Sequence, residues 1–352
     1  MLMSPFHILT TGARSPVPAL QQLLVYYGFP IAWRGLWNAQ AVAAEIARYA
    51  VWVVGDTYGD PAHEEIASTR AIVTAVRAAG TRVYGYVPVG QNTSGLTQAQ
   101  MCERVDQWVA LGVDGIFLDE FGFDYANTRA RQAAIVDYVH AKGLPYCANA
   151  WTAEDVMCDS ATELPWPADD WRHINFASGN PGNAPLVRAP GDAYMFENFG
   201  FDHNGPINIW DTQERAALTT TLAKAKGMQV WALAVLPETT PGTLNASKLG
   251  NLATLPNVGA YVAANAYLYD IEVVGLGGFS FGSNGTPIAT PLPAMAATAQ
   301  PATAPAAHDY TAGTAVRQFG PVGLTVTNKG STRKVVVTGA EPPLLKGQFP
   351  PS

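Results

Sequence analysis

Residues 114–125 of the chain spell DGIFLDEFGFDY. A short apolar run is followed at once by two carboxylates, Asp119 and Glu120. Apolar runs of about four to eight residues bounded by turn residues are typical of fully buried strands. In barrels of alternating strands and helices, functional side chains stand directly after the carboxyl ends of the strands. The stretch therefore predicts a buried strand over 114–118 whose end carries reactive groups.

The same pattern recurs outward from this stretch in both directions. Runs rich in Val, Ile and Tyr alternate with segments of helical period. Strands are predicted at 23–27, 51–55, 82–87, 114–118, 145–149, 193–197, 229–235 and 277–281. Helices are predicted at 39–49, 64–79, 98–111, 129–141 and 212–226, with a broken pair over 244–270. Such alternation indicates a parallel sheet covered by helices, and a span of about 260 residues favours a (β/α)8 TIM barrel.

A doubly wound nucleotide-binding sheet is the main alternative to the barrel. It would place a GxGxxG fingerprint after the first strand, but residues 26–35 read YYGFPIAWRG. The chain also contains no GxxxxGK[ST] loop. The barrel is therefore preferred, and no cofactor is expected.

Composition excludes several classes of protein. Of the 352 residues, 48% are hydrophobic and 14% charged, which allows a large core and excludes global disorder. A formal net charge of −7 without any long Lys/Arg run argues against nucleic acid as a partner. No uninterrupted apolar stretch reaches the roughly 18 residues of a membrane span. Three cysteines without CxxC spacing and six scattered histidines argue against a disulfide framework and a metal site.

The composition changes towards the end of the chain, and this change sets the predicted domains. Residues 285–307 are almost entirely Pro, Ala and Thr, which predicts an extended linker or strap. Residues 323–339 alternate β-formers around an Asn-Lys-Gly turn, which predicts a β-hairpin. A lone hairpin is marginal in water, so we expect it to dock on the barrel, on another subunit or on a larger assembly. The predicted division is a lead segment 1–19, a barrel 20–284, a strap 285–310 and a docking tail 311–352.

Three carboxylates are candidates for catalysis. Asp119 and Glu120 leave the fourth predicted strand, and Glu197 leaves the sixth. Because one strand separates these two, we expect the carboxylates to face each other across the barrel mouth. A pair of carboxyl groups suits cleavage of a glycosidic bond, which needs one acid and one nucleophile or base. The alternatives are that Asp119 or Glu120 caps a turn or pairs with Arg129 or Arg131, and that Glu197 is a surface or helix-capping residue.

Other polar and aromatic residues at strand ends would furnish a sugar cleft, because aromatic faces stack on sugar rings and amides or carboxylates bind their polar groups. The candidates for substrate binding are Asp56, Tyr58, Tyr86, Asn149, Trp151 and Asn198. Tyr26 and Tyr27 follow the first strand, where alternation predicts that one of them belongs to the core. Trp231 is predicted to lie in the core, and Glu238 at the rim.

Three segments resemble a known family. They are RVYGYVPVG (82–90), DQWVALGVDGIFLDEFGFD (106–124) and GLPYCANAW (143–151). Together they are similar to the spherulin-4-like barrel glycosidases and the related endo-α-1,4-polygalactosaminidases, with Leu118 in place of an aromatic residue. The similarity extends from about Leu23 to Trp151. It implies a (β/α)8 fold, hydrolysis of α-1,4-linked galactosamine or N-acetylgalactosamine polymers, and acidic site residues at Asp119, Glu120 and, by position, Glu197.

The leading functional prediction is a metal-independent glycoside hydrolase acting on an amino-sugar polysaccharide. Glu120 and Glu197 would be the acid and the base or nucleophile, while Asp119 orients one of them or holds the substrate. The main alternative is a non-catalytic carbohydrate-binding or structural barrel, such as a virion decoration or receptor-binding protein. A phosphate-binding barrel is a weaker alternative, because the loops after the last two predicted strands contain no basic residue.

The expected location follows from the first residues, MLMSPFHILTTGARSPVP, which lack the charged start and apolar run of a secretory signal. The family that the chain resembles is commonly secreted. We therefore expect a component of a bacteriophage virion, or a cytoplasmic protein that is released by lysis, with the tail serving as a docking element.

Overall fold

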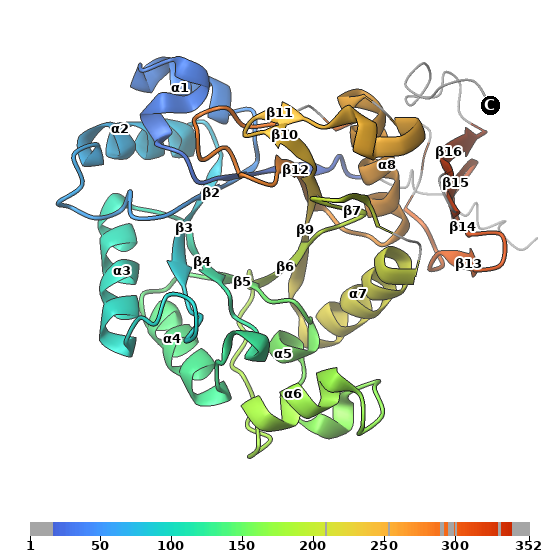
Figure 1. Ribbon diagram of the computed structural model, residues 1–352, viewed down its shortest axis with the longest axis horizontal. Helices are drawn as coiled ribbons and strands as arrows, with labels where there is room; N and C mark the ends of the chain where they lie inside the picture. Colours follow the sequence, from blue (N-terminus) through green and yellow to red (C-terminus); the bar gives the residue numbers. More distant parts are fainter. Residues whose placement is uncertain are drawn as a thin grey trace, which may run out of the picture.

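The computed structural model describes residues 17–207, 210–252, 254–288, 292–294, 299, 301–329 and 332–339. In this part of the chain, eight parallel strands close into a barrel in the order β1-β12-β9-β6-β5-β4-β3-β2 (Figure 1). The strands are β1 (Gln21–Tyr26), β2 (Val51–Val54), β3 (Arg82–Pro88), β4 (Gly115–Asp119), β5 (Tyr146–Asn149), β6 (Ala193–Glu197), β9 (Gln229–Leu236) and β12 (Val273–Gly278). The predicted TIM barrel is confirmed.

Helices surround the strands, as Figure 1 shows. They are α1 (Ala39–Ile46), α2 (Ile66–Ala78), α3 (Gln98–Leu111), α4 (Arg129–Ala141), α5 (Glu154–Met157), α6 (Trp171–Gly179), α7 (Arg215–Lys226) and α8 (Leu255–Leu268). The bounds of α3 and α4 coincide with those predicted, because both helices carry clear end signals. The α3 helix begins with a capping box between Thr97 and Gln100 and ends at Gly112 in the left-handed conformation, with φ 80°.

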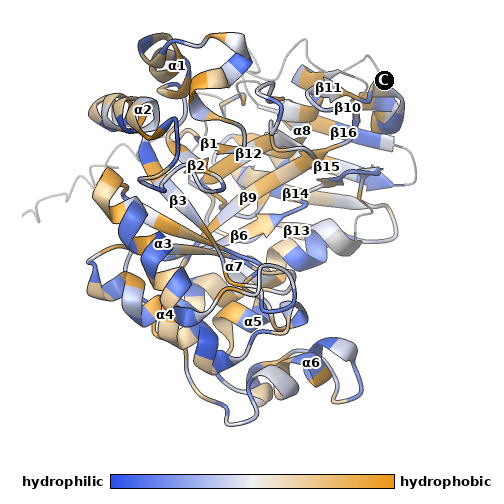
Figure 2. Cartoon of the chain, turned by 60° about the vertical axis from the view of Figure 1, so that its left-hand side comes forward, coloured by the Kyte–Doolittle hydropathy of each residue, from blue (hydrophilic) through white to orange (hydrophobic). Residues whose placement is uncertain are grey.

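The core has two layers. Side chains that point into the barrel pack against one another, and Tyr84 meets Trp231 edge to face with ring centroids 4.7 Å apart. Trp231 is 0% exposed, so its predicted place in the core is confirmed. The outward side chains of the strands pack against the apolar faces of the helices. In Figure 2 the strands are accordingly mostly hydrophobic, while the helices alternate between hydrophobic and hydrophilic residues.

The eighth strand begins four residues and ends three residues earlier than predicted, so the bounds 277–281 are wrong. The strand is Val273–Gly278, and a Cβ at Gly275 would lie only 2.6 Å from the carbonyl oxygen of Leu23 on β1. Glycine thus allows the close approach that closes the barrel. The aromatic residues after it led to the later prediction, but the chain leaves the strand there, and Phe281 has a φ of 48°.

The segment between β5 and β6 contains two helices, α5 and α6, that were not predicted. The α6 helix projects from the barrel in both views (Figures 1 and 2). The predicted helix over 212–226 also differs in its first turn, because a π-helix spans Trp210–Glu214 and α7 begins at Arg215. Both departures lie on the side of the barrel near β5 and β6.

The C-terminal part forms an antiparallel four-stranded sheet in the order β13-β14-β15-β16. Its strands are β13 (Ala307–Asp309), β14 (Thr314–Phe319), β15 (Val322–Lys329) and β16 (Thr332–Thr338). The predicted hairpin is present as β15 and β16, within a larger sheet than expected. Residues 1–16 of the predicted lead segment, 289–291, 295–298 and 300 of the strap, and 330–331 and 340–352 of the tail lie outside the described residues.

This C-terminal sheet packs on α8 (Figure 1). The α8 helix has no charged residue, and nearly all its side chains are buried, because it lies between the barrel and the sheet. Arg317 on β14 is 6% exposed and donates hydrogen bonds to the carbonyl oxygens of Tyr267 and Leu268 at the end of α8, at 3.0 and 2.8 Å. The same guanidinium pairs with Asp270 at 2.6 Å. One arginine thus caps the helix and anchors the sheet.

None of the described helices is long and apolar enough to cross a membrane.

Candidate active site

Three neighbouring strands place three polar side chains at one end of the barrel. Asp119 is the last residue of β4, Asn149 the last of β5 and Glu197 the last of β6. The strands pair in parallel in this order, so their carboxyl ends share one rim. This rim is called the barrel mouth below, and it is where barrel enzymes carry their reactive groups.

Asn149 bridges the two carboxylates. Its Nδ2 donates to Asp119 Oδ1 at 2.9 Å and to Glu197 Oε2 at 2.7 Å. Because both oxygens bond the same nitrogen, their separation cannot exceed the sum of these two lengths, about 5.6 Å. As predicted, carboxylates at the ends of the fourth and sixth strands lie close together, and the two that do so are Asp119 and Glu197.

The surroundings disfavour charge on both carboxyl groups. Burial raises the pKa of Glu197 to about 7, and the neighbouring charge of Asp119 adds to the effect, while the hydrogen bond from Asn149 and the charge of Arg215 oppose it. Burial also raises the pKa of Asp119, against hydrogen bonds from Asn149 and Tyr86. Two like charges this close resist ionising together. The pair can therefore hold a proton near neutral pH.

Glu120 points elsewhere. Its carboxylate accepts a short hydrogen bond from the hydroxyl of Thr93, in the loop between β3 and α3. That position depends on Gly90, where a Cβ would lie 2.6 Å from Glu120 Oε2. Asp119 and Glu120 thus diverge, as adjacent residues at the end of a strand do. The structure brings Asp119 to Glu197 and leaves Glu120 on the β3 side of the mouth.

Tyrosines surround the carboxylates. Tyr86 on β3 bonds Asp119 through its hydroxyl, and it packs edge to face on Tyr27, with ring centroids 5.2 Å apart. Burial raises the pKa of Tyr27, and the charges of all three carboxylates raise it further. Tyr26, by contrast, is fully buried in the core, so the predicted alternation of the two holds.

Sequence reasoning missed Tyr125. Burial and the charges of Asp124, Asp119, Glu197 and Glu120 raise its pKa to about 12, which places it close to the carboxylates. It lies in a short 3-10 helix, Phe123–Tyr125, that follows β4. The residue stands within the stretch that decides the fold, but no periodicity indicates that it lies near the carboxylates.

The two candidates after β2 differ in exposure. Asp56 is exposed, and its charge acts on Tyr86 and Tyr58. Tyr58 is only 5% exposed, packs against Phe29, and donates its hydroxyl to the carbonyl oxygen of Tyr27 at 3.3 Å. Asp56 is therefore open to a ligand, whereas Tyr58 supports the wall behind Tyr27.

Backbone strain gathers at the mouth. Asp56, Glu120 and Asn198 follow β2, β4 and β6 and have left-handed φ values of 57°, 54° and 60°. Such conformations are uncommon for residues other than glycine and recur at functional sites. They direct the chain away from the strand ends and leave the ends open.

Trp151 and Asn198 line one pocket of about 380 Å³ beside Glu197. Other residues of its wall were not predicted, because they come from α6, α7 and the loops around them. They include Trp166, Trp171, Arg172, Asp202 and Arg215. No spacing in the sequence links these residues to the strand ends, so only the fold brings them to the mouth.

The alternative that Asp119 or Glu120 pairs with Arg129 or Arg131 is not what the structure shows. Arg129 donates to Gln132 and to the carbonyl oxygens of Asp155 and Cys158, and Arg131 donates to those of Val89 and Leu96. Neither arginine pairs with Asp119 or Glu120 among the described residues. Glu238 accepts hydrogen bonds from Gly242 and Ser280 and so ties two loops together.

No group of three or more His, Cys, Asp and Glu side chains in the described ranges is arranged to hold a metal ion. Cys102, Cys147 and Cys158 are free thiols.

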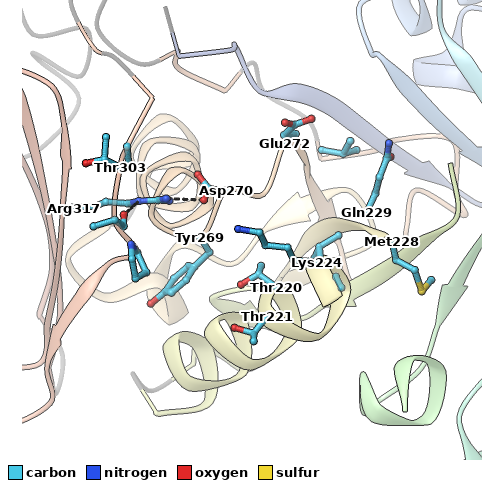
Figure 3. Close-up of a pocket in the computed structure, with 16 residues that line it drawn as sticks. Thr220, Thr221, Lys224, Met228, Gln229, Tyr269, Asp270, Glu272, Thr303 and Arg317 are labelled. Carbon is cyan, nitrogen blue, oxygen red and sulfur yellow. Dashed lines mark hydrogen bonds and ion pairs between the residues drawn. The ribbon is translucent and has the colours of Figure 1, made fainter. Parts of the chain in front are cut away.

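A second hollow, of about 660 Å³, lies at the opposite end of the barrel (Figure 3). Gln229 and Val273, the first residues of β9 and β12, contribute to its wall. The dashed line in Figure 3 marks the ion pair between Arg317 and Asp270, which the docking of the C-terminal sheet already uses. The hollow is therefore a seam between the barrel and the sheet, remote from the carboxylates.

No family model matches the sequence, and no curated protein does. The resemblance to the spherulin-4-like family therefore stays a prediction. The solved structures that are similar to the chain include glycosidases. The alpha-galactosidase I from Mortierella vinacea is 10% identical, with 88% of this chain and 80% of that chain covered and a TM-score of 0.44.

The glycoside hydrolase domain of PelA from Pseudomonas aeruginosa is 14% identical, with 62% of this chain and 85% of that chain covered and a TM-score of 0.34. A mutant of the O-GlcNAc hydrolase of Thermobaculum terrenum is 9% identical, with 75% and 56% covered and a TM-score of 0.40. The chain spans less than half, 46%, of another match, CpGH84B. A dihydrodipicolinate synthase from Agrobacterium tumefaciens is 11% identical, with 73% of this chain and 69% of that chain covered and a TM-score of 0.37.

Proposed function

We propose that the protein is a glycoside hydrolase whose reacting carboxyl groups are Asp119 and Glu197. The observation that carries the proposal is the bridge through Asn149, which holds the two groups within reach of one glycosidic bond. Buried structural carboxylates are normally paired with cations, whereas these two face each other across one amide and neither makes an ion pair among the described residues. Such a pair at the mouth of a barrel suits acid and nucleophile chemistry.

The roles follow from the surroundings of each group. Glu197, with a pKa of about 7, is the proton donor to the leaving oxygen. Asp119 accepts hydrogen bonds from Asn149 and Tyr86, which favour its charged form, and it attacks the anomeric carbon. The glycosidic bond breaks as the ester to Asp119 forms. Glu197, now ionised, then takes a proton from water, which attacks the anomeric carbon and releases Asp119.

The short separation favours retention of configuration. Retaining enzymes hold their carboxyl groups about 5 to 5.5 Å apart, and inverting enzymes about 6.5 to 9.5 Å apart. The upper limit of 5.6 Å that Asn149 sets applies to the two facing oxygens of these groups, and it agrees with the first range. Glu120 then serves as a sugar-binding residue on the β3 side, in place of the role as acid or base that its position in the sequence suggested.

We propose an amino-sugar polysaccharide of the α-1,4-galactosamine type as the substrate. Asp56 and Glu120 flank the reacting pair, and neither makes an ion pair among the described residues. Free carboxylates beside the reaction centre suit a sugar with a protonated amine. The resemblance of residues 82–151 to the polygalactosaminidases supports the same substrate.

The test is release of reducing ends from amino-sugar and neutral polysaccharides by the wild type and by Glu197→Gln. We expect release from a partly deacetylated galactosamine polymer and a loss of about a hundredfold or more in the variant. Proton NMR of the first product should show the anomeric configuration of the substrate. Binding of a polymer without any release would favour the alternative, a non-catalytic carbohydrate-binding barrel.

A role in a bacteriophage virion is a further proposal. It is supported by the outer face of the C-terminal sheet, where Val316 and Val336 are each 36% exposed and β16 is an edge strand. Asn251 covers the backbone of Arg333 on this edge, and the exposed apolar residues of the sheet suit docking to a larger assembly. Sedimentation of the full chain should reveal self-association or binding to virion proteins, and a strictly monomeric protein would contradict this role.

A further inference from the structure

The pocket that Trp151 and Asn198 line is built from several elements of the fold. Its wall comes from the loop after β5, from α6 and α7, and from Asn198, which follows Glu197 directly. The charge of Arg215, which is one of the lining residues, acts on Glu197, so this wall of the pocket lies close to the reaction centre. A volume of about 380 Å³ is large enough for a sugar unit.

Two tryptophans line the pocket and are open to solvent. Trp151 is 50% exposed and Trp171 is 53% exposed, although large aromatic side chains are mostly buried in proteins. Exposed aromatic rings in a concave site present flat apolar faces on which a sugar ring can stack. The pocket thus has the walls of a sugar subsite.

The charged groups of the pocket differ in what they already bind. Arg172 donates to Asp170 through Nε at 2.8 Å and Nη2 at 2.6 Å, so its charge is compensated. The buried carboxylate of Glu154 accepts the indole N–H of Trp166. Asp202 accepts the backbone N–H of Asn204 at 2.7 Å.

Arg215, the first residue of α7, is the exception. Among the carboxylates whose side chains the structure describes, none lies within ion-pair distance of its guanidinium. It is nevertheless held in place, because Nη2 donates to the carbonyl oxygen of Trp151 at 3.0 Å and the guanidinium also hydrogen-bonds the hydroxyl of Tyr194. The guanidinium also stacks on Phe196, 4.7 Å from the ring centroid, and on Trp151 at 5.3 Å. A fixed arginine with unused donors is the protein's usual partner for a carboxylate or phosphate.

We propose that this pocket is a subsite for a sugar that carries an anionic group, bound by Arg215 and stacked between the faces of Trp151 and Trp171. The inference rests on the proposed function and narrows its substrate. The carboxylates of the mouth bind an amino sugar, and the pocket next to them binds an acidic sugar. The natural substrate is then a polysaccharide in which amino sugars are joined to acidic ones, rather than a polymer of amino sugars alone.

The experiment compares two probes that differ only in charge: α-1,4-linked tetragalacturonate and the neutral galactose tetramer made from it by reduction of its carboxyl groups. Their affinities for the full chain are measured by titration calorimetry. We expect the wild type to bind the acidic tetramer about tenfold more tightly, as one charge-assisted bidentate contact allows. The preference should fall as salt rises from about 0.05 to about 0.5 M.

The variants locate this preference. In Arg215→Gln it should shrink to within about twofold, and in Arg215→Lys an intermediate preference should remain, since charge persists without the planar fork. Trp171→Ala should weaken both tetramers alike, by several-fold. Arg48→Gln, which removes an exposed arginine of the α1 side that pairs with Glu45, should change neither affinity. The thermal midpoint of each variant shows that it is folded.

Equal affinity of the wild type for the two tetramers would overturn the inference, as would a preference that survives in Arg215→Gln. Failure of the proposed function has a different signature, because hydrolysis is measured separately. A charge preference without release of reducing ends from any polymer would reject the hydrolase and leave a binding subsite. Release without a charge preference would reject the subsite alone.

Discussion

Two of the places where this molecule buries charged side chains differ in the partners that they give to the charge. At the junction with the C-terminal sheet, Arg317 finds a partner for each of its nitrogens: the carbonyl oxygens of Ala304, Tyr267 and Leu268, and the carboxylate of Asp270. At the barrel mouth, Asp119 and Glu197 face each other across the amide of Asn149, and neither makes an ion pair among the described residues. One place brings opposite charges together, and the other brings like charges together.

The difference separates stability from function. A buried charge with all its donors satisfied fixes the geometry of the elements it joins. Two like carboxyl groups held this close destabilise the folded state when both are ionised. Such a pair, at the ends of two strands separated by one strand, agrees with the proposed glycosidase chemistry. The partners of buried charged groups are thus a more useful guide to the site than the volume of a hollow.

The largest effect that would sharpen this comparison is on catalysis. Asp119→Asn removes the proposed nucleophile while keeping the shape of the side chain, and we expect turnover to fall by about a thousandfold or more. Glu120→Gln is the matched control, because it alters the next residue and can keep the contact with Thr93. It should lose no more than about tenfold. Initial rates of reducing-end release measure both, and a larger loss in Glu120→Gln would return the catalytic role to Glu120.

The next effect is on stability. Arg317→Met leaves the carbonyl oxygens at the end of α8 without their donor, and we expect the free energy of unfolding to fall by about 3 kcal/mol. Lys334→Met, on an exposed position of β16, should change it by less than about 0.5 kcal/mol. Urea unfolding followed by fluorescence measures both. Turnover per folded molecule should not change in either variant, and a loss of activity in Arg317→Met would mean that the sheet contributes to the mouth.

How far the sequence predicts this molecule depends on the range of the interactions involved. The strands and the paired carboxylates follow from local patterns, because a buried strand and its end lie within a few residues, as in 114–120. The meeting of Asp119 with Glu197 follows from the order of parallel strands. Arg215 and Tyr125 could not be predicted, because they reach the mouth through loops whose course is set by packing. The shift of the eighth strand to Val273–Gly278 likewise depends on a backbone contact that glycine permits and no periodicity shows.

The sequence also could not predict that Asp119, and not Glu120, faces Glu197. The two are adjacent and chemically similar, and only the direction of each side chain distinguishes them. That direction is fixed by the pleat of β4 and by the left-handed backbone at Glu120, with φ 54°. A shift of one residue in the register of a strand reverses the direction of the side chain at its end. Strand bounds predicted from sequence vary by more than one residue.

The smallest expected effect tests whether the mouth is indeed a destabilised region. The pKa of Glu197 is raised to about 7 in the folded protein from an ordinary value of 4.5. The unfolded chain therefore releases this proton first as pH rises, so the contribution of Glu197 to stability is full below pH 4.5 and is lost as pH rises through 7. Glu197→Gln cannot ionise and should be more stable than the wild type by about 1 to 3 kcal/mol at about pH 8, and by little at about pH 4.

The wild type must be compared with Glu197→Gln because a second carboxyl group titrates over the same pH range. Burial raises the pKa of Asp155 to about 7, so Asp155 lowers the stability of both proteins as pH rises. The difference between the wild type and Glu197→Gln removes that common contribution. Urea unfolding of both at about pH 4, 6 and 8 gives the difference directly. If it does not grow with pH, then Asn149 satisfies both carboxylates fully, and the mouth would resemble the junction at Arg317 instead of contrasting with it.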